Sequence, residues 1–143
     1  MTRYACRSLA VLLALAAPAA LAAGNDATYR ATLDAASEVP ATQSKGSGEV
    51  TATFDPATKR LSWTGSYTNL TGPVTAAHFH GPAKPGENAG VLVPVTATAS
   101  PFTGEATLDD AKAADLEAGR LYFNLHTAAN PKGEIRGQVM RAR

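Results

Sequence analysis

The feature that most constrains this chain is the alternation of apolar and polar residues in short segments after residue 24, separated by Gly, Pro, Asn and Asp. Alternation with a period of two is typical of strands that bury one face. Helical spacing is nearly confined to Asp110 to Ala118, where Asp109 or Asp110 can cap the first turn and Gly119 can end the helix. We predict an all-β fold, an antiparallel Greek-key-like β-sandwich of about eight short strands with one short connecting helix. The expected strands are Thr28 to Asp34, Gly48 to Phe54, Arg60 to Thr68, Val74 to His80, Val91 to Val95, Phe102 to Leu108, Arg120 to Thr127 and Glu134 to Met140.

The same alternation predicts which side chains form the core. Pro56 fixes the backbone of a turn after Asp55, so the strands on either side should form a hairpin. Residues two apart share a face of a strand, and the apolar set on each strand should face inward. The expected core residues are Val50, Ala52, Phe54, Leu61, Trp63, Leu121, Phe123 and Leu125, with Tyr67 a further candidate.

The first 23 residues differ from the rest. Arg3 and Arg7 precede an apolar run over Leu9 to Ala17, and Pro18 and small residues follow. The run is about half the ~20 residues that a membrane span needs, and Ala20-Leu21-Ala22 has the small-x-small form of a cleavage site. We predict a secretory signal peptide over residues 1–23 and a periplasmic or secreted protein without a membrane span after cleavage. A short membrane anchor is the alternative if cleavage fails.

Length and charge restrict the number of domains and the classes of partner that the chain can have. The chain has 143 residues, enough for one domain. It carries 13 basic and 12 acidic residues, and loss of Arg3 and Arg7 would leave 11 basic residues. With no Lys/Arg stripe, the sequence argues against nucleic acid as a partner. Cys6 is the single cysteine and precedes the apolar run, so the mature domain would have no thiol.

Three histidines remain after such cleavage. His78 and His80 lie two apart in an expected strand, so both imidazoles should point to the same side. His126 ends another expected strand, on the face that also carries Tyr122 and Asn124. If these strand ends lie close, three imidazoles converge, and such a set suits zinc or copper, copper being the stronger binder. The alternative is that the His-x-His pair arose by chance on a solvated strand.

Other chemistries find little support in the sequence. No G-x-S-x-G segment, phosphate-binding glycine loop or cysteine nucleophile occurs in the expected domain. Among the acidic residues, Glu134 is the one whose position in the sequence could bring it near the histidines. It alternates with Ile135 and Arg136 on the last expected strand, so Glu134 and Arg136 could point towards the histidine face. An ordinary polar sheet face is the alternative for that pair.

Three segments of the chain resemble one known family, the CHRD (chordin) domain. They read ATLDAASEVP over residues 31–40, AAHFHGPAKPGENAG over residues 76–90 and GRLYFNLHTAANPKGEIRGQV over residues 119–139. The resemblance covers nearly all of residues 24–143, which are therefore identified as a CHRD domain. It implies an extracytoplasmic binding or structural role without specifying a ligand. The family pattern also has histidines at the positions of His78, His80 and His126.

A weaker similarity is to copper and copper-zinc superoxide dismutases, which are Greek-key sandwiches with a His-x-His copper pair near a guiding arginine. His78 and His80, the loop ending at Gly90, and Arg136 are similar to that arrangement, although the disulfide cysteines and a second zinc loop are missing. We therefore expect a copper site, with zinc as the alternative, ligated by His78, His80 and His126.

This resemblance suggests roles for the residues around the histidines. Arg136 would be the catalytic residue, supplying positive charge near the open position, with Tyr122, Asn124 and Glu134 supporting the ligands. The activity, if there is one, would be redox chemistry of the superoxide dismutase type on a small anion. The alternative is a metal-free interaction or structural module that binds another exported protein.

Overall fold

The computed structural model describes residues 25–143, and the expected signal peptide lies outside them. The described chain contains eight strands and one helix. Each boundary falls within one residue of the range expected from the alternation. The elements are β1 (Ala27–Asp34), β2 (Ser47–Asp55), β3 (Arg60–Thr68), β4 (Val74–His80), β5 (Val91–Val95), β6 (Phe102–Thr107), α1 (Asp110–Glu117), β7 (Leu121–Thr127) and β8 (Ile135–Arg141).

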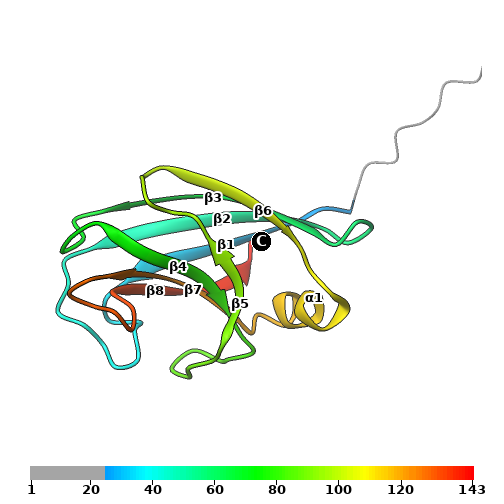
Figure 1. Cartoon of the computed structure of the whole chain (residues 1–143). Coiled ribbons are helices and arrows are strands. Elements are labelled where there is room, and N and C mark those ends of the chain that lie inside the picture. Colours follow the sequence, from blue (N-terminus) through cyan, green and yellow to red (C-terminus); the bar gives the residue numbers. More distant parts are fainter. Residues whose placement is uncertain (1–24) are drawn as a thin grey trace, which may run out of the picture.

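The strands form one antiparallel sheet in the order β5-β4-β7-β8-β1-β2-β3-β6. The sheet folds back on itself near the β8–β1 pair, so that β1, β2, β3 and β6 lie over β4, β5, β7 and β8 (Figure 1). Gly137 permits this close approach, since a Cβ there would lie 2.1 Å from the Thr32 carbonyl oxygen. The all-β sandwich predicted from the sequence is confirmed.

The core lies between the two layers. Trp63 of β3 packs edge-on against Phe79 of β4 at 5.1 Å between ring centroids. Phe102 of β6 stacks on Phe123 of β7 at 5.8 Å. Burial of large apolar side chains from both layers supplies most of the stabilisation of such a sandwich. The expected core residues Val50, Ala52, Phe54, Leu61, Trp63, Leu121, Phe123 and Leu125 are all buried, and Tyr67 is partly buried.

The hairpin turn and the helix cap expected from the sequence are both present in the structure. The β2–β3 hairpin pairs Asp55 with Arg60 around the Pro56 turn, where the Asp55 carboxylate accepts hydrogen bonds from Ala57 N and Thr58. Asp109 is the residue that caps α1, accepting from Lys112 N at 2.8 Å, and Gly119 follows the helix with φ +67°. Within residues 25–143, no helix is long and apolar enough to cross a membrane.

β7 departs from a simple two-faced strand. All seven of its residues are buried, including the polar side chains of Tyr122, Asn124 and His126. One face of β7 meets the core. The other is covered by the loops that follow β1, β4 and β7, which contribute partners to the histidine face through Glu38, Ala89 and Pro131.

Candidate metal centre

Strand pairing brings the three histidines together. β4 pairs with β7 so that His78 lies opposite Asn124, His80 opposite Tyr122 and Ala76 opposite His126. Residues on one face of paired strands are neighbours both directly and diagonally. The result is a cluster in which His78, His80 and His126 each offer a nitrogen, and these three nitrogens lie within 4.8 Å of one another. The convergence expected from the sequence is therefore present in the structure.

Backbone carbonyls orient two of the rings. His80 Nδ1 lies 3.0 Å from the Ala89 carbonyl oxygen, and His126 Nδ1 lies 3.1 Å from that of Pro131. A carbonyl oxygen accepts a hydrogen bond, so each Nδ1 carries the proton when its ring is neutral, and each Nε2 then has a free lone pair. This arrangement is common around metal-binding histidines, because it fixes the ring and the tautomer.

The nitrogens that do not face these carbonyls lie close to one another or to Asn124. His126 Nε2 lies 3.2 Å from His78 Nδ1. Both His80 Nε2 and His126 Nε2 lie 3.0 Å from Asn124 Oδ1. His80 and His126 thus have oxygen atoms next to all four of their ring nitrogens, whereas two neutral imidazoles carry two N–H groups between them. His78 Nδ1–H can donate to His126 Nε2, but none of these groups has a proton left for the contact between His80 Nε2 and Asn124 Oδ1, so the lone pairs of those two atoms face each other. A positive ion bound between these atoms would remove that repulsion, so the donor set fits a metal.

Burial favours the neutral form of two of the rings, because it lowers the pKa of His78 and of His80. Burial lowers the pKa of His78, and the nearby His126 and His80 lower it further. Burial also lowers the pKa of His80, although hydrogen bonds to Ala89 and Asn124 oppose the change. A neutral imidazole is the form that binds a metal ion. His78 is partly exposed, so the cluster is open to solvent on the side of this ring.

Tyr122 and Arg136 support the cluster from the side. The Tyr122 ring stacks on His80 at 4.7 Å with 5° between the planes, and its hydroxyl donates to the Ala89 carbonyl. The Arg136 guanidinium carbon lies 3.4 Å from the Tyr122 ring centre. Because β7 lies between β4 and β8, His80 and Arg136 approach Tyr122 from opposite sides. The two contacts hold the His80 ring plane in place.

Arg136 lies opposite Asn124 in the β7–β8 register. It is 2% exposed, and its guanidinium donates to Asn88 Oδ1 at 3.0 Å and to the Glu87 carbonyl. Tyr122 separates it from His80, because β8 is on the far side of β7 from β4. Arg136 therefore anchors the β4–β5 loop, whose Ala89 carbonyl orients His80.

Glu134 belongs to a different cluster from the histidines. It is fully buried, and Ser44, Thr71, Thr127 and Asn130 all donate to its carboxylate. Residue 127 follows His126 on β7, so its side chain points to the opposite face. Glu134 bonds to Thr127 and so lies with that face. The sequence pattern placed Glu134 on the last strand, whereas the strand begins at Ile135.

Sequence reasoning missed Glu38. Its side chain is 6% exposed and lies beside Asn124 and Gly133, where a Cβ on Gly133 would be 2.3 Å from Glu38 Oε1 and 2.8 Å from Asn124 Nδ2. Burial raises the pKa of Glu38 to about 7, while Arg136 and a hydrogen bond from Asn124 oppose the shift. No motif predicts this contact, because Glu38 reaches the site through the β1–β2 loop.

A match to a family model covers residues 29–139, and the family is the CHRD domain. The chain belongs to the CHRD domain family. No curated protein and no solved structure shows a significant match to the chain. The matched range includes every residue of the histidine cluster and its supporting contacts.

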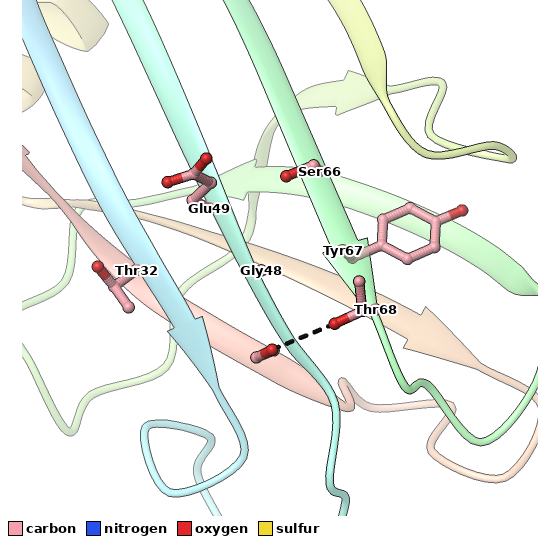
Figure 2. A pocket seen from close by; sticks show the side chains of 7 residues that line it. Thr32, Gly48, Glu49, Ser66, Tyr67 and Thr68 are labelled. Atoms are coloured by element: carbon pink, nitrogen blue, oxygen red, sulfur yellow. Dashed lines mark hydrogen bonds between the residues drawn. The ribbon is translucent and has the colours of Figure 1, made fainter.

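A hollow elsewhere on the CHRD domain has different chemistry. It has a volume of about 270 Å³ and lies over Gly48 on the outer face of β1, β2 and β3 (Figure 2). Hydroxyl groups line it, with Ser47 and Thr68 joined at 3.4 Å between their oxygens. This face belongs to the other layer of the sandwich from β4 and β7, so the hollow is not part of the histidine site.

Proposed function

We propose that this CHRD domain binds one transition-metal ion through His78, His80 and His126. The observation that carries the proposal is that each of the three histidines offers a nitrogen within 4.8 Å of the other two. Backbone carbonyl oxygens bond to Nδ1 of His80 and of His126, which leaves Nε2 of both rings available. Imidazole nitrogen suits copper and zinc, and the affinity order of divalent ions favours copper. Copper is therefore the proposed ion and zinc the alternative.

The chain's own groups would prepare the site for an ion. The carbonyls of Ala89 and Pro131 fix the tautomers, and Tyr122 stacks on His80. Burial keeps His78 and His80 in the neutral form that a metal needs. A bound copper ion would supply one-electron chemistry, and its use for that purpose depends on access by a substrate.

Redox chemistry of the superoxide dismutase type on a small anion is a second candidate function. The partial exposure of His78 favours it, because a small molecule could approach the cluster from that side. Arg136 does not add support, since its guanidinium is buried against Tyr122 and the β4–β5 loop. The alternative to any metal function is an interaction module for another exported protein.

We also propose that the domain acts outside the cytoplasm, in the periplasm or as a secreted protein. The support is the basic and apolar pattern of residues 1–23 together with membership of the CHRD family. The intact mass of protein recovered from the exported fraction tests this proposal. A mass that includes Met1 would contradict cleavage and favour a membrane anchor instead.

Metal analysis of the purified domain, combined with calorimetric titration of Cu²⁺ and Zn²⁺, tests the metal proposal. We expect about one bound ion per chain, tighter binding of copper than of zinc, and loss of binding in His126→Ala. Gln138→Ala is the matched control, because Gln138 lies on β8 and bonds to Ala83 and Gly119 rather than to the cluster. Wild-type protein that binds neither ion would contradict the proposal and favour the interaction module.

A further inference from the structure

We propose that Asn124 Oδ1 is the fourth ligand of the ion, so that the site is a closed N₃O site that retains its metal. This inference rests on the proposed metal function and goes beyond it. The sequence suggested that Asn124 only supports the ligands, with an open position left for a substrate. The structure points to a different arrangement, in which the amide oxygen occupies that position.

The distances between donor atoms carry the inference. Tetrahedral ligands at 2.0 to 2.1 Å from an ion are separated by about 3.3 Å from one another. Asn124 Oδ1 lies 3.0 Å from both His80 Nε2 and His126 Nε2, and His126 Nε2 lies 3.2 Å from His78 Nδ1. Shifts of a few tenths of an ångström would bring these three pairs to the separation found in a tetrahedral zinc site, and the three histidine nitrogens lie within 4.8 Å of one another. A residue that only supported the ligands would bond to the protonated side of a ring, as Ala89 and Pro131 do.

The amide is oriented for this role. Asn124 Nδ2 lies on the side of Glu38 and Gly133, and the Asn124 amide acts to lower the pKa of the Glu38 carboxyl group. The ionised form of Glu38 can only accept a hydrogen bond, so it favours the amide nitrogen on its own side and leaves the amide oxygen on the histidine side. Gly133, with φ +129°, leaves no side chain between the two groups. Glu38 is therefore a positioning residue for Asn124.

A closed site has different chemistry from an open one. Structural metal sites fill four positions with protein atoms, whereas catalytic sites keep one position for water or substrate. An amide oxygen is also a harder ligand than a thiolate or thioether, and so suits Cu²⁺ or Zn²⁺ better than Cu⁺. The inference thus favours a domain that holds a divalent ion over one that cycles copper on a small anion.

Azide titration of the Co²⁺-loaded protein, followed by visible absorption, separates closed from open coordination. We expect the wild-type spectrum to be that of four-coordinate Co²⁺ and to be insensitive to azide. Asn124→Ala should bind Co²⁺ more weakly than the wild type, and its spectrum should change with azide. Asn124→Asp keeps an oxygen ligand and should restore resistance to azide. Asn130→Ala, which removes an amide from the Glu134 cluster instead, should leave the spectrum unchanged.

Two outcomes would overturn the inference. Azide that alters the wild-type spectrum as it alters that of Asn124→Ala would show an open three-histidine site, with the proposed metal function intact. Wild-type protein that binds no Co²⁺, Zn²⁺ or Cu²⁺ would overturn the metal function and this inference together. Far-UV circular dichroism of each metal-free variant establishes that it is folded. If Asn124→Ala is unfolded, the comparison of wild type with Asn124→Asp and Asn130→Ala still decides between the two kinds of site.

Discussion

Two polar clusters lie at adjacent positions of β7 and differ in how fully their hydrogen bonds are made. Around Glu134, each carboxylate oxygen accepts from donors, with Ser44 and the Thr71 amide on Oε1 and Thr71, Thr127 and Asn130 side chains on Oε2. Around His126, the Asn124 oxygen lies 3.0 Å from two ring nitrogens, and the N–H that His78 Nδ1 can offer reaches only His126 Nε2, which leaves His80 Nε2 without a donor. Buried polar groups are normally paired, so a saturated cluster is expected for structure and an unsaturated one for binding.

The titration of Glu134 and Glu38 shows the same contrast. Burial acts to raise the pKa of Glu134, but the hydrogen bonds from Ser44, Thr127 and Thr71 outweigh it and hold the pKa at about 2. Burial raises the pKa of Glu38, beside the histidine cluster, to about 7. Donors around a carboxylate therefore decide the sign of the shift.

Replacing Glu134 should give the largest change in stability. Glu134→Ala leaves the Thr71 amide and the surrounding hydroxyl groups without their acceptor, and loss of one partner from a buried charged network costs roughly 3 to 5 kcal/mol. Chemical denaturation of the metal-free protein measures this cost. Metal affinity of the folded variant should be unchanged. A loss of metal binding without a loss of stability would reverse the roles assigned to the two clusters.

Lowering the pH should remove the contribution of Glu134 to the free energy of unfolding. The pKa of Glu134 is lowered from 4.5 to about 2 on folding, so its contribution is complete above pH 4.5 and is lost as the pH falls from 4.5 through about 2. The shift corresponds to about 3 kcal/mol at 1.36 kcal/mol per pH unit. Denaturation of wild type and Glu134→Gln at a series of pH values measures the difference. Parallel curves for the two proteins between pH 5 and pH 2 would show that Glu134 is not the group responsible.

Binding of a metal ion at the histidine cluster should stabilise the folded protein. An ion that binds the folded state alone stabilises it by about 2.7 kcal/mol at a free concentration of 100 times its Kd. We expect this gain for wild type with Cu²⁺ or Zn²⁺, measured by thermal unfolding, and no gain for His126→Ala. Thr64→Ala, on the outer face of β3, is a control that should keep the gain. An equal gain in His126→Ala would place the ion elsewhere.

The smallest change is expected from His126→Ala without metal. The ring is buried on the face of β7 that points away from the core, so its removal takes away its bonds to the Pro131 carbonyl and to His78 but no core packing. We expect a loss of about 1 kcal/mol, the scale of one intramolecular hydrogen bond. Chemical denaturation in the presence of a chelator measures it. A loss as large as that of Glu134→Ala would mean that the histidine cluster is structural even when it holds no ion.

The alternation of residues was enough to predict most of the fold and part of the site. A period of two specifies a strand and its buried face locally, so the ranges of the strands, the burial of Trp63 and the shared face of His78 and His80 could be read directly from the sequence. The same rule placed Tyr122, Asn124 and His126 on one face. The capping of α1 by Asp109 was also a local matter.

Only the tertiary structure decided which strand faces meet and which loops cover them. The β4–β7 register places His78 opposite Asn124, and the position of β8 beyond β7 puts Arg136 on the far side of Tyr122. Loop paths bring the Ala89 and Pro131 carbonyls to the histidines, and bring Glu38 to Asn124. These contacts depend on chain segments far apart in sequence. A residue pattern reports the periodicity of its own strand, whereas strand order and loop path result from packing of the whole core.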